Sequence, residues 1–133
     1  MAISETNIRT GIENGRARYA FTVVNEHLQE RNIDSSDYKS YIKKLPAMIQ
    51  VNGLGQTLAF CLAKKKEYRA IYDQIEAWIR EHHSGLISRY DPDGRKTFIE
   101  ILISMNSSDY RIVTTETMAL LNWMRRFADG LIA

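Results

Sequence analysis

The sequence predicts an all-α protein, a compact single-domain helical bundle that spans residues 1–133 and contains about five to six helices. Three observations support this prediction. Apolar residues recur with helical spacing nearly throughout the chain. Pro46 and Pro92 are the only prolines, which leaves room for long helices. The length, with 44% apolar and 26% charged residues, suits one globular domain with its own core.

The first predicted helix covers about residues 4–31. From Ala17 to Leu28 its apolar residues follow the i, i+3, i+4, i+7 spacing of a helix that buries one face. Gly11 and Gly15 weaken its first half, since glycine disfavours helices relative to alanine. Two small residues four apart could also let another backbone come close.

The second predicted helix begins near residues 34–37, a run of aspartates and serines that offers several N-caps. Pro46 lies inside its apolar pattern and should bend or break it, because proline lacks a backbone donor. The helix should end at Asn52 and Gly53, since both residues tolerate a left-handed C-cap.

Four further segments complete the prediction. A third helix runs from about residue 54 to the lysines at 64–66, and a fourth from about 68 to 83. Residues 91–94 (DPDG) are a strong turn signal. The run 97–105 (TFIEILISM) fits helix or strand by periodicity, but a lone strand would have no partner, so we predict a helix. The last helix covers about residues 108–131, and its apolar stripe is Val113, Thr117, Leu120, Leu121, Met124, Phe127 and Leu131.

No motif predicts a cofactor, a metal site or a catalytic group. Gly53-Leu54-Gly55 lacks the third glycine and the preceding strand of a dinucleotide loop. Asp91 and Asp93 resemble the opening of a calcium loop, but the later positions of that pattern do not match. His82 and His83 are adjacent and therefore point to different sides of a helix. A site assembled only in three dimensions remains open.

Cys61 is the only cysteine and lies on an apolar stripe, so we expect a core residue rather than a nucleophile. Without disulfides the expected compartment is reducing, and we predict a cytoplasmic protein. The N-terminus does not resemble a signal peptide, and the uncharged run 46–63 is too polar to span a bilayer. We therefore expect no membrane partner.

Basic residues are concentrated in one segment. Residues 39–69 carry six net positive charges, so the rest of the chain, whose total is +2, carries four net negative charges. Starting the segment at Asp34 lowers its excess to four. The segment is either a solvated face that complements helix dipoles or a surface for phosphates or an acidic partner. Tyrosines and tryptophans are also numerous, which suits a protein that docks.

Two blocks of sequence resemble a known family. Residues 44–60 read KLPAMIQVNGLGQTLAF, which is similar to the signature of the small (fifth) subunit of the Cmr-type, type III-B CRISPR effector complex. The end of the chain resembles that family's closing helix at Tyr110, Thr115, Glu116, Ala119, Leu120, Leu121, Trp123, Arg125, Arg126, Phe127 and Ala128. The two blocks cover about a third of the chain, and their order and the matching total length extend the resemblance over nearly all of it. Residues 84–105 look idiosyncratic, so nothing is carried over to them.

This resemblance implies an all-helical subunit that is not an enzyme. In such antiviral-defence complexes several copies stack as a minor filament beside the subunits that hold the guide RNA. The implied partners are the backbone and large Cmr-type subunits, further copies of the chain itself, and the guide and target RNA. The bent, uncharged connection of residues 46–55 would then be a feature of the fold rather than an active site.

If RNA is a partner, its contacts should be with backbone phosphates, because pairing with the guide already carries the sequence. From charge alone, the candidate nucleic-acid-binding residues are Lys39, Lys43, Lys44, Lys64, Lys65, Arg69, Arg125 and Arg126. The alternative is a free-standing helical nucleic-acid-binding regulator, which would need a polar recognition helix; the segment 56–61 is too apolar for one. A small metal-independent hydrolase has no support beyond the possibility of a site built in space.

Overall fold

A computed structural model describes residues 5–30, 35–64 and 66–132, with side chains from residue 11 onward. Within these ranges the chain forms seven α-helices and no strand, which confirms the all-α prediction. No helix in the described ranges is long and apolar enough to cross a membrane. The helices are α1 (Glu5–Leu28), α2 (Ser35–Asn52), α3 (Leu54–Ala63), α4 (Lys66–His82), α5 (Ser84–Tyr90), α6 (Phe98–Ser104) and α7 (Ser107–Leu131).

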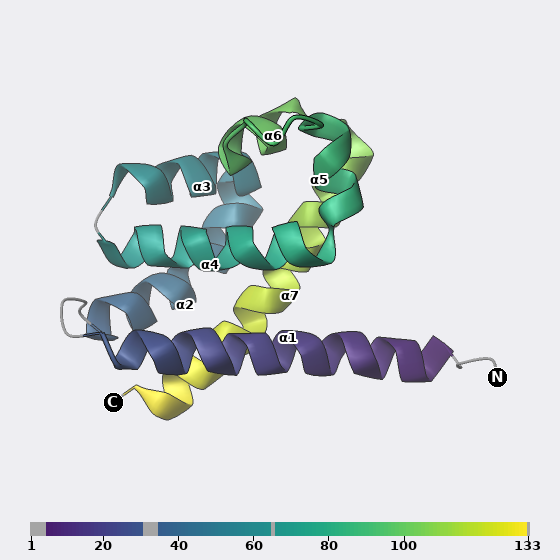
Figure 1. The fold of residues 1–133 in the computed structure, drawn as a ribbon. Helices are drawn as coiled ribbons and strands as arrows, with labels where there is room; N and C mark the ends of the chain where they lie inside the picture. Colours follow the sequence, from purple (N-terminus) through teal and green to yellow (C-terminus); the bar gives the residue numbers. More distant parts are fainter. Residues whose placement is uncertain (1–4, 31–34, 65, 133) are drawn as a thin grey trace.

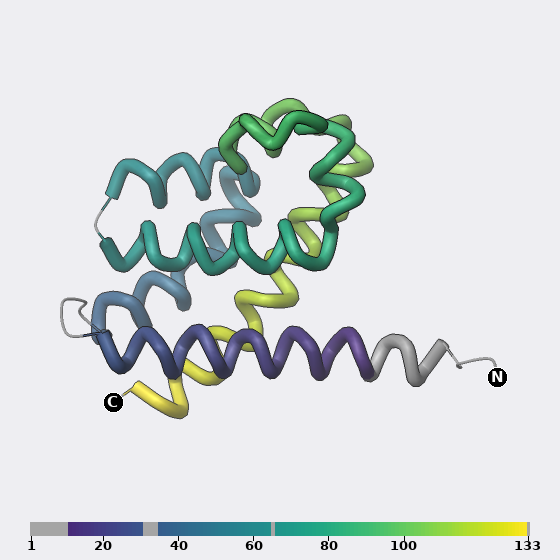
Figure 2. Tube along the Cα trace, in the orientation of Figure 1, coloured from purple at the N-terminus to yellow at the C-terminus, as the bar shows by residue number. Residues whose placement is uncertain are grey.

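Helix α7 is the element against which the other long helices pack. It runs diagonally behind α4 and α1, and it contacts α1, α2 and α4 (Figure 1). Its buried stripe includes Val113, Thr117, Leu120, Leu121 and Met124, as the helical spacing predicted. Helices α3 and α4 lie side by side, and the chain trace brings the start of α2 close to the end of α7 (Figure 2).

The junction between α2 and α3 is a single residue, Gly53, with φ 85° and ψ 162°. Pro46 lies inside α2 and does not break it, so that alternative of the prediction was wrong. The helix ends at Asn52, as expected. The Tyr110 hydroxyl of α7 accepts a hydrogen bond from the Gly55 backbone N–H at 2.8 Å, which ties the start of α3 to α7.

Residues 84–105, to which the family resemblance was not carried over, form α5, a turn and α6. The Asp91 carboxylate accepts hydrogen bonds from the backbone N–H groups of Arg95 and Lys96, so it closes the predicted turn. Thr97 and Glu100 form a capping box that starts α6. The run 97–105 is therefore helical, as predicted, and Phe98, Ile101 and Leu102 enter the core.

A buried carboxylate joins three helices. Glu116 of α7 is 7% exposed and accepts hydrogen bonds from Arg16 of α1, at 2.6 and 3.2 Å, and from the Trp78 indole of α4, at 2.7 Å. Burial alone would raise the pKa of Glu116, but the bonds from Arg16 and Trp78 and the charge of Arg16 lower it below its usual value. Gly15 lies beside Trp78, where an added Cβ would be 3.8 Å from the ring, so it faces this side chain rather than another backbone.

Replacing Gly53 with alanine should lower the free energy of unfolding by about 1–3 kcal/mol, because its backbone angles are essentially restricted to glycine. Urea unfolding followed by circular dichroism measures this loss. Gly55→Ala is the matched control: a Cβ there would meet the Tyr110 hydroxyl at an ordinary 3.5 Å. We expect that variant to be at least as stable as the wild type, and equal losses in the two variants would contradict the role of the backbone angles.

Glu116→Gln should destabilise the protein by roughly 3 kcal/mol at pH 7, the lower end for breaking a buried ion pair, because Arg16 keeps some solvent contact. The folded-state pKa lies below the ordinary value of 4.5, so the stabilisation is full above that value and is lost as the pH falls through the lowered one. The stability gap between wild type and variant should therefore shrink in acid. The exposed Glu81→Gln is the control, and a gap independent of pH would refute the assignment.

Candidate nucleic-acid interface

Two of the candidate lysines pair with the end of α7. Lys43 Nζ lies 3.1 Å from a carboxylate oxygen of Asp129, and Lys39 Nζ donates to the carbonyl oxygen of Ile132 at 3.1 Å. These contacts place positive charge at the negative end of the α7 dipole. Lys39 is also only 25% exposed. Lys39 therefore acts as a complement to the helix dipole, and both lysines are less available for phosphate than their spacing in the sequence indicated.

Three aromatic rings from three helices meet at the surface of α2, α3 and α4; we call them the ring cluster (Tyr41, Phe60 and Tyr68). Tyr41 and Tyr68 stack with ring centroids 3.7 Å apart, and Phe60 meets Tyr68 edge-on at 5.1 Å. Tyr68 is buried, whereas Tyr41 and Phe60 are partly exposed. Burial raises the pKa of Tyr68, so its phenol stays neutral. The cluster is a fixed apolar platform between the helices.

A lysine lies at each end of the ring cluster. Lys44 Nζ is 5.9 Å from the centroid of Tyr41, and Lys64 Nζ is 5.2 Å from that of Phe60. Each lysine follows its ring by three or four residues on the same helix or just beyond its end, which is why the pairs meet. Cation–π contacts at exposed sites are worth about 0.5–1 kcal/mol. They hold the two ammonium groups at the surface without a carboxylate partner in the described contacts.

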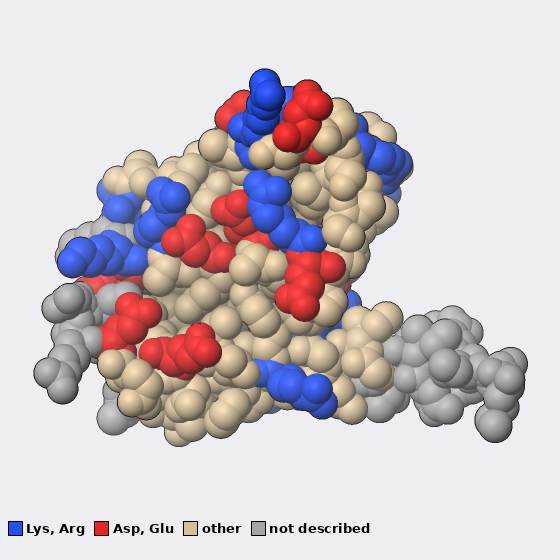
Figure 3. All heavy atoms as spheres, in the orientation of Figure 1, with Lys and Arg blue, Asp and Glu red and all other residues tan. Residues whose placement is uncertain are grey.

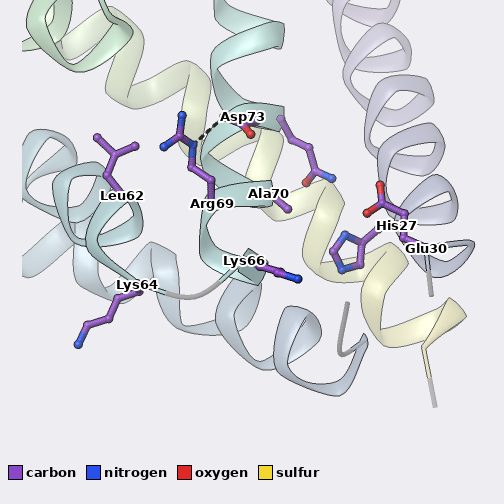
Figure 4. A pocket seen from close by; sticks show the side chains of 9 residues that line it. His27, Glu30, Leu62, Lys64, Lys66, Arg69, Ala70 and Asp73 are labelled. Atoms are coloured by element: carbon purple, nitrogen blue, oxygen red, sulfur yellow. Dashed lines mark hydrogen bonds and ion pairs between the residues drawn. The ribbon is translucent and has the colours of Figure 1, made fainter. Parts of the chain in front are cut away.

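An open groove of about 640 Å³ separates the end of α1 from the start of α4 (Figure 4). Its lining includes His27 and Glu30 of α1, Lys64 after α3, and Lys66, Arg69 and Asp73 of α4. The Arg69 guanidinium donates to Asp73 at 3.2 Å and also lies 5.4 Å from the centroid of the Tyr72 ring. Lys65, another candidate, lies outside the described residues.

The α7 candidates point in different directions. Arg125 makes a long contact of 3.4 Å with Asn122 and lines a depression beside Pro46 of α2. Arg126 is exposed, and as the next residue it projects about 100° further around the helix. The structure therefore brings Arg125 next to α2, and it does not combine Arg125 and Arg126 into one patch.

Acidic residues interrupt the basic ones over much of the surface. Figure 3 shows Lys and Arg side chains interspersed with Asp and Glu on the face that carries α4, with basic side chains gathered towards the α3–α4 end. Such a surface produces only a weak long-range field. Any phosphate contacts would therefore depend on local groups such as Lys44, Lys64 and Lys66.

The groups considered for chemistry occupy structural positions. Cys61 is fully buried, and burial raises the pKa of its thiol to about 12, which confirms it as a core residue. His82 packs on Trp78 with ring centroids 3.7 Å apart, and His83 precedes α5 with its Nε2 3.9 Å from Glu116. Among the described residues, no group of three His, Cys, Asp or Glu side chains could hold a metal ion.

Sequence reasoning missed the ring cluster, Lys66 and His27. The three or four residues between Tyr41 and Lys44, and between Phe60 and Lys64, were visible signals of ring–lysine pairs. Nothing in the sequence showed that the two pairs would join through Tyr68. Nothing indicated that His27, at the end of α1, would face the start of α4.

Comparison with known proteins gives one family. The model of a family described as CRISPR-associated protein (Cas_Cmr5) matches residues 12–131. Among solved structures, the chain is similar to an X-ray crystal structure of a CRISPR-associated Cmr5 family protein from Thermus thermophilus. The two share 24% sequence identity with a TM-score of 0.68, and the match covers 89% of this chain and 94% of the other. At this identity the structural match shows the fold, and the match to the family model shows the family.

Proposed function

Since the chain belongs to the Cmr5 family, the small subunit of the type III-B CRISPR (Cmr) complex, we propose that it stacks in several copies as a minor filament and contacts RNA through backbone phosphates. It does so in the cytoplasm and without cleaving RNA. The observation that carries the RNA part is the ring cluster with Lys44 and Lys64 at its two ends. Sequence-independent contact suits a complex in which guide pairing reads the target.

The ring cluster supports this role through the way it presents charge. Lys44 and Lys64 come from different helices, and the rings fix their stems. Lys43 and Arg69, by contrast, have a carboxylate partner within 3.2 Å. A phosphate approaching the cluster therefore meets two ammonium groups whose charge is not already neutralised by those contacts.

The regulator alternative receives no comparable support. Leu54, Leu58 and Cys61 of α3 are buried, and Gln56 is the only polar side chain among its exposed residues. A recognition helix needs several polar side chains to read bases in the major groove. We therefore propose contact with RNA phosphates rather than duplex reading.

Two separate apolar patches support stacking of copies. Val51 and Ile103, which are 81% and 69% exposed, lie near the α2–α3 junction. Phe21 and Leu131 are 44% and 39% exposed, and Phe21 packs edge-on against Phe127 of α7. Tyr110, beside the junction, and Phe127 are separated by about 25 Å along α7. If one patch meets the other on the next copy, the contact is head-to-tail and propagates rather than closing.

The double variant Lys44→Gln/Lys64→Gln should lower the slope of log affinity against log salt by about two, one for each lost phosphate contact. Fluorescence anisotropy with a labelled oligoribonucleotide at several salt concentrations measures it, for both the isolated subunit and the assembled complex. The RNA should remain full length, with and without divalent metal. The control is Arg95→Gln/Lys96→Gln, in the turn before α6; a slope equal to that of this control would reject the ring cluster as the contact.

Val51→Glu should reduce the number of copies of this subunit in the purified complex, because it places a charge in the most exposed apolar position of the described chain. Native mass spectrometry measures the copy number. The matched variant Ala77→Glu, on the exposed side of α4, should leave it unchanged. An unchanged copy number with Val51→Glu would show that this patch does not take part in stacking.

A further inference from the structure

His27, at the end of α1, is buried without a full set of partners. Its side chain is 2% exposed and stacks on the Tyr38 ring, with centroids 3.6 Å apart. Its Nε2 is shielded from solvent and has no hydrogen-bond partner. Buried polar nitrogens in folded proteins nearly always have one, so an unpaired one indicates a missing ligand or a specific role.

The groove beside His27 is built for an anion. Lys66 is the first residue of α4, a helix of 17 residues, and it lines the groove with Lys64 and Arg69. Figure 4 shows the Lys66 side chain extending towards the nitrogen-bearing edge of the His27 ring. The N-terminus of α4 adds the positive end of its helix dipole. Of the three basic side chains, only Lys66 extends towards this nitrogen, whereas Lys64 and Arg69 point away from it (Figure 4).

Arg69 and Asp73 neutralise each other, so the groove lining keeps Lys64 and Lys66 together with one further carboxylate, Glu30. Glu67, the residue after Lys66, is buried. Burial lowers the pKa of His27, against the opposing charges of Glu30 and Glu67, and so favours a neutral imidazole. A neutral imidazole can donate one N–H without adding a buried charge.

We propose that His27 and Lys66, at the N-terminus of α4, form a seat for one phosphate of an RNA backbone, which rests on the RNA contact proposed above. With a small movement of the His27 ring towards the groove, Nε2 would donate to a phosphate oxygen there, and Lys66 would neutralise the charge. Lys64 belongs to both the ring cluster and the groove. A single strand crossing the cluster therefore continues into the seat, which favours a polymer over an isolated anion.

The test uses the full-length protein with ¹⁵N-labelled histidine, followed by NMR during addition of a ten-nucleotide oligouridylate or of inorganic phosphate. We expect the ring-nitrogen signals of His27 to shift saturably with the oligonucleotide, while His82 and His83 serve as internal references. His27→Phe keeps the stack on Tyr38 and assigns the signal. The exposed Lys66→Gln should weaken RNA binding at least threefold and lower its salt slope by about one. Arg95→Gln, with the same loss of charge, should do neither.

The outcomes separate the seat from the wider function. If RNA binds but the His27 signals stay constant, or if Lys66→Gln matches Arg95→Gln, the seat is refuted and the ring cluster alone carries RNA. If inorganic phosphate shifts the NMR signals of His27 but the oligonucleotide does not, the groove is a site for small anions. That result would overturn its assignment to RNA. If neither ligand shifts His27 and no RNA binds, both proposals fall.

Discussion

The other long helices pack against α7, so its position determines theirs. The position of α7 is in turn determined by the hydrogen bonds of Glu116. Its buried carboxylate has donors on α1 and α4, so three helices must cross at one point for the charge to be satisfied. An apolar stripe alone allows a helix to slide by a turn at little cost, whereas a buried carboxylate tolerates no such shift. With this crossing set, the α2–α3 junction lies against Tyr110, near the start of α7. The surface that presents Lys44 and Lys64 follows from that geometry.

Most of the fold was accessible from the sequence because its helices bury regular stripes. The pattern of α7 alone placed Leu120, Leu121 and Met124 correctly in the core. The effect of Pro46 was harder to predict, because a helix can absorb one lost hydrogen bond when its neighbours pack well on either side. The short helix α5 was not predicted, since seven residues carry too little periodicity to be recognised.

The candidate interface was less predictable, because charge along a sequence does not show which charges are already paired. Lys39 and Lys43 have ideal helical spacing, yet both contact the end of α7, which comes much later in the chain. Lys44, their immediate neighbour, lies over an aromatic ring instead. His27 gave no signal at all, since its significance depends on an unpaired nitrogen that only the packed structure reveals. The sequence does not show which side chains from distant segments pair with one another.

The near-neutral charge of the chain agrees with a subunit that acts in several copies. A net charge of +2 with mixed surface signs gives little long-range attraction, so a single copy should hold RNA weakly. Copies arranged along one strand bind it together, because the first contact raises the effective concentration of the next. In the proposed filament, weak contacts would then add up over its length, while a free subunit would not compete for unrelated RNA. On this reasoning, a strongly basic small subunit would bind RNA before assembly, and a few well-placed lysines per copy suffice.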